Sequence, residues 1–490
     1  MPTPTSSESR LAGSLRLAAM LLFVAALIPA GISVTTKRQL FAAGGLTDNW
    51  VYLGANLRVT GVLGEQTLPL VLRAPGYPLF LAGLFSALEK PPVVTYDYLL
   101  RGAELVYAAQ ALLLAASGVL LFLWLARFVS RTTALAAGLV FATGPHAVVL
   151  AGLVHYSLLH LFLLVAGGWA LHGLVASESP SPRRAFSAGL VWGCATLVRS
   201  TTLILPAFLL VVFLARWRAP RRTLLALGWL VAGMAVVVAP ATIRNYRVAH
   251  RFVAVNLQAG AAIWGSSVKL LPGDSDSYRW YELSDDFMRV FTKVTGETQY
   301  DYGGFARHHL ALEDAFWIEA RANLRRDPRP YLMNGLRTLR ALCFDTSSIL
   351  IRVFRYSQPP NPLPDQFWFR GSEAREFLPE VPAKGYVRLG ALLTGLAWIG
   401  VALALHRREV PALVPAALFA CLAAAHAVTY MDVLYHYVRL PFVAFLAFYG
   451  LERLATVAPA PVRPQALTAA RVAALLICAA SLLLTGELLV

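Results

Sequence analysis

The chain has 490 residues, of which 57% are hydrophobic and 14% are charged, and its mean hydropathy is +0.59. Soluble domains carry about a quarter charged residues, so this composition excludes an ordinary soluble enzyme and indicates a polytopic membrane protein. The formal net charge of +16 comes from scattered cations without a contiguous basic patch, which argues against a nucleic-acid partner.

We expect an all-α polytopic fold with about eleven transmembrane helices, because a bilayer-spanning helix needs roughly 20 apolar residues. The expected spans are residues 15–35, 101–125, 132–150, 155–175, 185–198, 201–215, 223–241, 386–405, 410–430, 440–454 and 471–489. The first run is longer than the apolar region of a signal peptide, which indicates an uncleaved anchor. The two short runs around Arg199 form either a hairpin or one bent span, and we expect the hairpin because the charge topology then closes.

The positive charges indicate the orientation of the chain. With the N-terminus inside, the short cytoplasmic loops contain most of the loop arginines, whereas residues 145–154 outside contain no Lys or Arg. The inside arginines are Arg127, Arg131, Arg183, Arg184, Arg216, Arg218, Arg221, Arg222, Arg407 and Arg408. This distribution follows the positive-inside rule. We therefore expect a multi-pass protein of the inner (plasma) membrane.

Two long polar stretches fall on the outer side and suggest three parts. Residues 1–241 would form an N-terminal membrane module with a catalytic first outer loop at 37–100, residues 242–385 a small mixed extracytoplasmic region, and residues 386–490 the C-terminal helices. Residues 78–88 are apolar but too short to span, which predicts an interfacial helix. Residues 305–324 have helical periodicity, and arginines alternate with apolar residues over 331–356, as in a helix resting on lipid headgroups.

No cofactor or metal is expected. The four cysteines are widely spaced, and neither they nor the histidines and acids show metal-ligand spacing. The sequence contains no glycine-rich phosphate loop and no nucleotide-binding fingerprint.

Several short motifs follow one another in a definite order. They are Asp48-Asn-Trp-Val-Tyr52, Arg73-Ala-Pro-Gly-Tyr-Pro78, Leu197-Val-Arg-Ser200, Ile243-Arg-Asn-Tyr246 and, more weakly, Tyr435-His-Tyr-Val-Arg-Leu-Pro441. In this order, and over about residues 15–270, the chain resembles the GT-C superfamily of polyprenyl-phosphate-dependent glycosyltransferases. Within it, the bacterial group of protein O-mannosyltransferases, aminoarabinose transferases and lipopolysaccharide galacturonosyltransferases is the most similar.

The resemblance implies an integral-membrane glycosyltransferase. Such an enzyme moves a sugar from a polyprenyl-phosphate donor to a lipid, glycan or protein acceptor at the extracytoplasmic face, with inversion, and works among membrane lipids. The alternative is a transporter or lipid flippase, which would have polar residues at mid-span and internal repeats. Here the span centres are mostly Leu, Ala and Val, and polar residues gather at the outer ends, which favours chemistry at the surface.

Asp48 is the expected general base, because the sugar donor is already activated and only the acceptor needs to lose a proton. The alternative role is a helix cap, since Thr47-Asp48-Asn49 is a good capping sequence. Tyr52 lies one helical turn further on and faces the same side. It would orient the base or the donor, or lie in the interface as an aromatic anchor.

Arginines are expected to bind the donor phosphate, because a guanidinium matches phosphate oxygens bidentately. Arg73 precedes a rigid Pro-Gly-Tyr-Pro turn that contains Tyr77 and would contact the donor phosphate or the acceptor, or else anchor in headgroups. Arg199 lies between two apolar runs, where an ionisable residue suggests function, although snorkelling is the alternative. One of Arg244 and Arg247 would also bind phosphate.

Three further residues complete the expected substrate-binding group. His155 stands at the outer start of a span, where the resembled group often has an acid, and would line a polar cavity or cap a helix. His436 and Arg439 would close the donor cavity from the C-terminal side. The alternative is that the adjacent Tyr435 and Tyr437 mark an aromatic belt.

Overall fold

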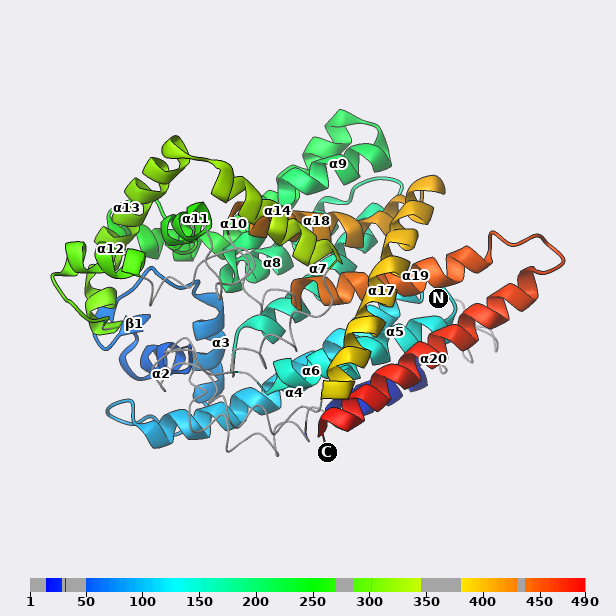
Figure 1. Ribbon diagram of the computed structural model, residues 1–490, viewed down its shortest axis with the longest axis horizontal. Coiled ribbons are helices and arrows are strands. Elements are labelled where there is room, and N and C mark those ends of the chain that lie inside the picture. Colours follow the sequence, from blue (N-terminus) through cyan, green and yellow to red (C-terminus); the bar gives the residue numbers. More distant parts are fainter. Residues whose placement is uncertain are drawn as a thin grey trace.

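The computed structural model describes residues 15–28, 31, 50–152, 154–268, 285–300, 302–344, 380–429 and 437–489, and this part of the chain is almost entirely helical (Figure 1). The elements are an N-terminal helix (Leu15–Ile28), α2 (Trp50–Thr60), β1 (Gly64–Glu65), β2 (Leu68–Pro69), α3 (Gly76–Phe85), α4 (Tyr96–Leu125), α5 (Arg131–Thr143), α6 (Pro145–Ala151), α7 (Ser157–Val175), α8 (Pro182–Val198), η2 (Ser200–Ile204), α9 (Leu205–Trp217), α10 (Pro220–Ala249), α11 (Ala259–Ser267), α12 (Asp285–Thr295), α13 (Tyr302–Arg326), α14 (Arg329–Phe344), α17 (Glu380–His406), η4 (Val410–Leu413), α18 (Val414–Val428), α19 (Leu440–Ala455) and α20 (Arg463–Leu489). The expected all-α polytopic fold is confirmed.

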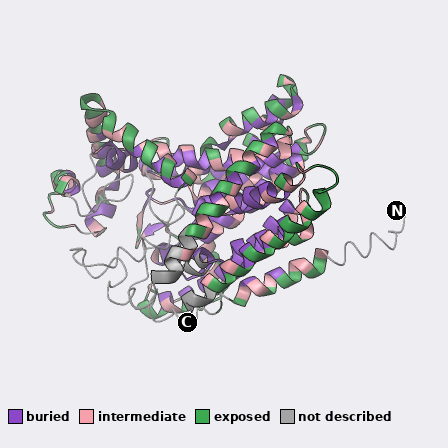
Figure 2. Cartoon of the chain, turned by 45° about the vertical axis from the view of Figure 1, so that its right-hand side comes forward, coloured by how far each residue is buried: buried purple, intermediate pink, exposed green. Residues whose placement is uncertain are grey.

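Within the described residues, 7 helical segments are long and apolar enough to cross a membrane. Other expected spans form shorter helices, such as α5 and α19, so the count of about eleven stays a prediction. Large apolar side chains, including Val211, Leu224 and Leu483, are exposed along the outer faces of the helices, while buried residues lie between helices (Figure 2). Apolar side chains on the outer surface are what a helix bundle in lipid requires.

The expected span 132–150 is instead two helices, α5 and α6. Gly144 follows α5 with an extended backbone, φ −67° and ψ 162°, and Pro145 begins α6. A residue before proline is disfavoured in the helical region, and proline itself donates no backbone hydrogen bond. The break therefore has a local cause that an apolarity count does not detect.

The chain does turn back at Arg199, which confirms the hairpin. At the start of α9, Arg199 contacts Tyr156 just before α7. At the end of α9, the Arg216 Nε donates to the carbonyl oxygen of Val175, the last residue of α7 (2.7 Å). Helix α9 therefore runs parallel to α7. Because Arg184, near the start of α8, donates to Gly173 (3.4 Å) near the end of α7, α8 runs antiparallel to both.

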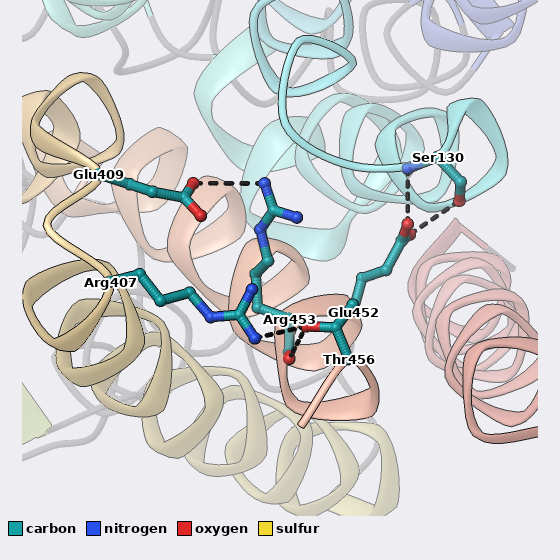
Figure 3. A network of polar contacts seen from close by, with 6 residues as sticks. All are labelled: Ser130, Arg407, Glu409, Glu452, Arg453 and Thr456. Carbon is teal, nitrogen blue, oxygen red and sulfur yellow. Dashed lines mark hydrogen bonds and ion pairs between the residues drawn. The ribbon is translucent and has the colours of Figure 1, made fainter. Parts of the chain in front are cut away.

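The expected cytoplasmic arginines gather at one end of the bundle. Besides Arg184 and Arg216, this end contains the polar network of Figure 3, in which Glu452 accepts hydrogen bonds from the Ser130 backbone and hydroxyl (2.8 and 2.7 Å). Arg453 pairs with Glu409 (3.2 Å). The network joins the starts of α5 and η4 to the ends of α17 and α19.

Helix α8 is held in place mainly by α10. The approach is so close that a Cβ on Gly189 would lie 2.1 Å from the carbonyl oxygen of Leu230. Only glycine permits such contact between two backbones. This packing sets the position of the residues that follow α8.

A second, smaller core lies beyond the bundle, where α11, α12 and α13 pack together (Figure 1). Its buried aromatic side chains include Trp264, Phe287, Phe291 and Phe316. The expected helix at 305–324 is confirmed by α13. The expected helix at 331–356 is confirmed as far as Phe344 by α14, and residues 345–356 lie outside the described part.

The expected interfacial helix at 78–88 is α3, which packs against α2, α4 and α8. Whether it lies flat on a membrane stays a prediction, as does the division of the chain at residues 241 and 385. Helix α10 passes through residue 241 without a break and ends at Ala249.

Candidate active site

A cavity of about 150 Å³ opens where the first outer loop meets the bundle. Its lining comes from five separate parts of the chain: the loop around α2 and α3, the start of α7, the junction of α8 and η2, the segment after α10, and the end of α18. The lining residues are Trp50, Arg73, Ala74, Tyr156, Val198, Arg199, Ser200, Thr201, Asn256, Gln258, Ala259, Ala262 and Thr429.

Two arginines, each stacked on an aromatic ring, dominate the cavity. The Arg73 guanidinium carbon lies 5.2 Å from the centre of the Trp50 ring, and that of Arg199 lies 5.3 Å from the centre of the Tyr156 ring. The two rings pack edge to face with their centroids 5.3 Å apart. Arg199 also donates a hydrogen bond to the Tyr156 hydroxyl. The aromatic pair thus holds both cations on the same cavity.

The local backbone explains how the arginines are brought together. Arg199 is the C-cap of α8, with φ −151° and ψ 121°. Helix α3 begins directly against this end, since a Cβ on Gly76 would lie 2.7 Å from the backbone of Leu197 and Val198. Because Gly76 follows Arg73 by three residues, the contact fixes the Arg73 loop beside Arg199.

A second anchor ties the loop to the segment that follows α10. The backbone nitrogen of Leu257 donates to the carbonyl oxygen of Val71 (2.9 Å), and the Asn256 amide donates to Leu72 (3.3 Å). Arg244 contributes to the same junction, because its two terminal nitrogens donate to Leu70 (2.7 Å) and Leu63 (2.6 Å). Arg244 therefore binds the backbone of the first outer loop and does not line the cavity.

Two other expected residues lie directly behind the cavity wall. Tyr77 is fully buried and packs against the Trp50 ring at 5.7 Å, while its hydroxyl donates to Gln110 (3.3 Å). The His155 ring lies 3.9 Å from the Tyr156 ring and is hydrogen-bonded to Ser157. Both residues support the aromatic pair from behind.

The remaining expected residues lie apart from the cavity or outside the described part. Tyr52 accepts a hydrogen bond from the backbone of Gln66 (3.3 Å). Arg439 is buried and donates to the carbonyl oxygens of Ala341 and Leu342 (3.1 and 3.0 Å) at the end of α14. Asp48 and His436 are outside the described residues.

The structure also places at the cavity residues that were not among the expected site residues. Trp50 lies two residues after Asp48, and Tyr156 lies one residue after His155. The expected residues therefore indicated the right segments of the chain. Asn256 and Gln258 lie in no motif, and nothing in the sequence pointed to them.

A smaller cavity of about 20 Å³ adjoins the first, and Gln258 and Ala262 line both. Its buried Glu313 accepts hydrogen bonds from the backbone of Gly260 (2.6 Å) and Ala261 (3.4 Å) at the start of α11. Burial raises the pKa of the Glu313 carboxyl and lowers the pKa of His309 one turn away. Among the residues described, no group of three or more His, Cys, Asp or Glu is placed to hold a metal ion.

Comparisons with known proteins identify the fold. No family model matches the chain, and no curated protein matches it in sequence. The solved structure of the archaeal oligosaccharyltransferase AglB from Archaeoglobus fulgidus, in complex with an inhibitory peptide and a dolichol-phosphate, is similar at a TM-score of 0.52 and 15% identity, over 96% of this chain and 55% of that chain. The oligosaccharyltransferase of the same organism in complex with zinc and sulfate gives a TM-score of 0.51 at 13% identity, over 95% and 53%.

ArnT from Cupriavidus metallidurans bound to undecaprenyl phosphate gives a TM-score of 0.38 at 16% identity, over 92% of this chain and 80% of that chain. The chain spans about half the length of the oligosaccharyltransferases it matches. The shared architecture covers nearly the whole of this chain, which has the fold of the archaeal oligosaccharyltransferase AglB.

Proposed function

We propose that this protein is a membrane glycosyltransferase that takes a sugar from a polyprenyl-phosphate donor. The sugar passes to a lipid, glycan or protein acceptor at the extracytoplasmic face, with inversion at the anomeric carbon. The observation that carries the proposal is the convergence of Arg73 and Arg199 on one cavity through the Trp50–Tyr156 pair. A solved relative in fold is described as a complex with a dolichol-phosphate, which is a ligand of this class.

The number of cations suits the charge that develops during transfer. The donor is a phosphodiester with one negative charge, whereas the departing polyprenyl phosphate is a monoester whose charge approaches −2 at neutral pH. The attraction between the two guanidiniums and the phosphate grows as the second negative charge forms on the phosphate. The guanidiniums therefore stabilise the transition state more than the bound donor, which is the condition for catalysis.

In the proposed step, the acceptor oxygen or nitrogen forms a bond to the anomeric carbon as the bond from that carbon to the phosphate oxygen breaks. The acceptor's proton goes to Asp48, and the electron pair of the broken bond leaves with the phosphate. Asp48 precedes the cavity-lining Trp50 by two residues, and two residues of chain reach at most about 7 Å. One base is enough, because direct displacement needs no covalent intermediate.

The outer location of the reaction is supported by the two ends of the bundle. Tyr156 and Arg199 stand at one end of α7 and α9, and the arginine-rich loops with Arg184 and Arg216 stand at the other. Positive loops remain in the cytoplasm. With this orientation, the cavity faces the extracytoplasmic side of the inner membrane.

The test uses the full chain in lipid vesicles with undecaprenyl-phosphate sugars labelled in the sugar and an envelope extract as acceptor. We expect label to move to the acceptor with release of undecaprenyl phosphate, and Arg73→Ala and Arg199→Ala to abolish both. Movement of the intact labelled donor across the bilayer, without release of undecaprenyl phosphate, would overturn the proposal in favour of a flippase.

A further inference from the structure

One side of the cavity carries uncharged hydrogen-bonding side chains instead of arginines. Thr201 follows Arg199 at the start of η2, and Asn256 and Gln258 come from the segment after α10. The Asn256 amide nitrogen donates to Leu72 (3.3 Å), the residue before Arg73. The uncharged group is therefore attached to the backbone that carries one of the two guanidiniums.

Polar atoms in this group lack hydrogen-bond partners. Thr201 Oγ1 and Asn256 Oδ1 are buried and make no hydrogen bond within the described part of the chain, and the same holds for Trp50 Nε1. The orientation of the Asn256 amide follows from its nitrogen, which also donates to Gln258 Oε1 (3.2 Å). Its oxygen is left as an acceptor. Buried polar atoms without partners are rare in native structures and call for an explanation.

A hydroxyl-rich ligand supplies what these atoms need. Each sugar hydroxyl both donates and accepts a hydrogen bond, so it suits the Asn256 oxygen as well as the Thr201 hydroxyl and the Trp50 N–H. The cavity volume of about 150 Å³ is also informative, because an engineered cavity of about that size in another protein binds one benzene ring. The space is on the scale of one six-membered ring.

We propose that Thr201, Asn256 and Gln258 form the subsite that binds the hydroxyls of a single transferred sugar and thereby determine which monosaccharide donor the enzyme uses. This inference rests on the proposed function. The phosphate lies at Arg73 and Arg199, and the sugar ring extends from it toward the uncharged side of the cavity. Discrimination arises because a sugar that lacks a matching hydroxyl leaves these buried atoms unpaired.

The experiment compares the full chain with Thr201→Val, which removes the hydroxyl and keeps the shape, and with Thr201→Ser, which restores a hydroxyl. Asn256→Leu is a second, independent variant, which tests the subsite even if Thr201→Val leaves kcat/KM unchanged. The probes are undecaprenyl phosphates carrying glucose, galactose, galacturonic acid or 4-amino-4-deoxyarabinose, and undecaprenyl phosphate without sugar. The readouts are kcat/KM for each donor and the binding of the sugar-free lipid.

We expect Thr201→Val and Asn256→Leu each to lower kcat/KM for the preferred donor about tenfold, which corresponds to about 1.4 kcal/mol, and to narrow its preference over the other sugars. Thr201→Ser recovers most of the loss, and binding of sugar-free undecaprenyl phosphate stays within about twofold in the Thr201 variants. Unchanged ratios among the donors in both variants, with an active wild type, would overturn the subsite alone. A wild type that neither binds undecaprenyl phosphate nor transfers any sugar would overturn the proposed function with it.

Discussion

Replacement of Arg199 by lysine separates the shape of the guanidinium from its charge. Lysine keeps the positive charge but presents a point charge in place of the planar fork that matches phosphate. In the structure, Arg199 stacks on the Tyr156 ring at 5.3 Å and donates to the Tyr156 hydroxyl. A lysine ammonium can lie over the ring or donate to the hydroxyl, but it cannot make both contacts as the planar fork does, so lysine will not hold the same position in the cavity.

The expected magnitude follows from the bonds that are lost. A hydrogen bond to a charged group contributes about 1.5–3 kcal/mol, and a cation–π contact at a partly exposed site contributes about 0.5–1 kcal/mol. Arg199 is half-buried, so solvent weakens its interactions and the lower part of the first range applies. Loss of one phosphate bond and part of the stacking then lowers kcat/KM for the donor by about 10–100-fold.

The assay measures kcat/KM with undecaprenyl-phosphate sugar donors in lipid nanodiscs. Arg127→Lys is the matched control, because the Arg127 guanidinium carbon lies 5.2 Å from the centre of the Trp169 ring at the other end of the bundle. We expect Arg127→Lys to keep wild-type activity. An Arg199→Lys variant within about twofold of wild type, or an equal loss in Arg127→Lys, would refute the assignment of Arg199 to the donor phosphate.

Three further predictions concern the base, pH and topology. Asp48→Asn keeps the size of the side chain and removes its basicity, so transfer falls by about 10²–10⁴-fold while donor binding persists; near-normal turnover would make Asp48 a helix cap. Burial lowers the pKa of the His309 imidazole below its ordinary 6.5. Between 6.5 and the lowered pKa, the unfolded state therefore binds more protons than the folded state. The free energy of unfolding falls as the pH drops through this range. Acidification from about pH 7.5 to 5.5 should therefore lower the amide protection factors in α13, after correction for the intrinsic pH dependence of exchange. The decrease should be smaller in His309→Gln, with His308→Gln as the control. Glu313, whose pKa burial raises, takes up a proton in acid and favours the folded state, so the difference between wild type and His309→Gln is the relevant quantity; no difference would contradict the prediction. Cysteines introduced at residues 216–222 should be labelled only from the cytoplasm, and labelling from outside would reverse the orientation.

Most helices could be predicted from apolarity and charge because each is a local property of the chain. The run at 201–215 corresponds to η2 and α9, and its arginine-rich end lies beside the end of α7, as the charge pattern indicated. The break at Gly144–Pro145 was missed because an apolarity window does not weigh backbone conformation. Helix α10 begins three residues before the expected span at 223, because its first turn, at Pro220, is helical but polar.

Part of the candidate site could likewise be predicted from the sequence, and part depends on tertiary contacts. Arg73 and Arg199 stood out in the sequence because an arginine among apolar residues is costly and rarely accidental. Arg244 stood out equally, yet its nitrogens bind the loop backbone, and no local pattern separates an arginine that lines a cavity from one that holds a loop. The contacts that make the difference come from residues distant in the chain.

The membrane class, the helix pattern and the arginine-rich loops can be read from the sequence, because hydropathy and charge are properties of each residue. The same properties indicate a few polar residues as candidates for the site. The folded chain was needed to show that Arg73 and Arg199 share a cavity, that Trp50 and Tyr156 hold them there, and that Asn256 lies beside them. Those neighbours depend on the close approach of α3 to the end of α8 at Gly76. Such long-range packing arises from the simultaneous fit of many side chains, which no single segment of the sequence encodes.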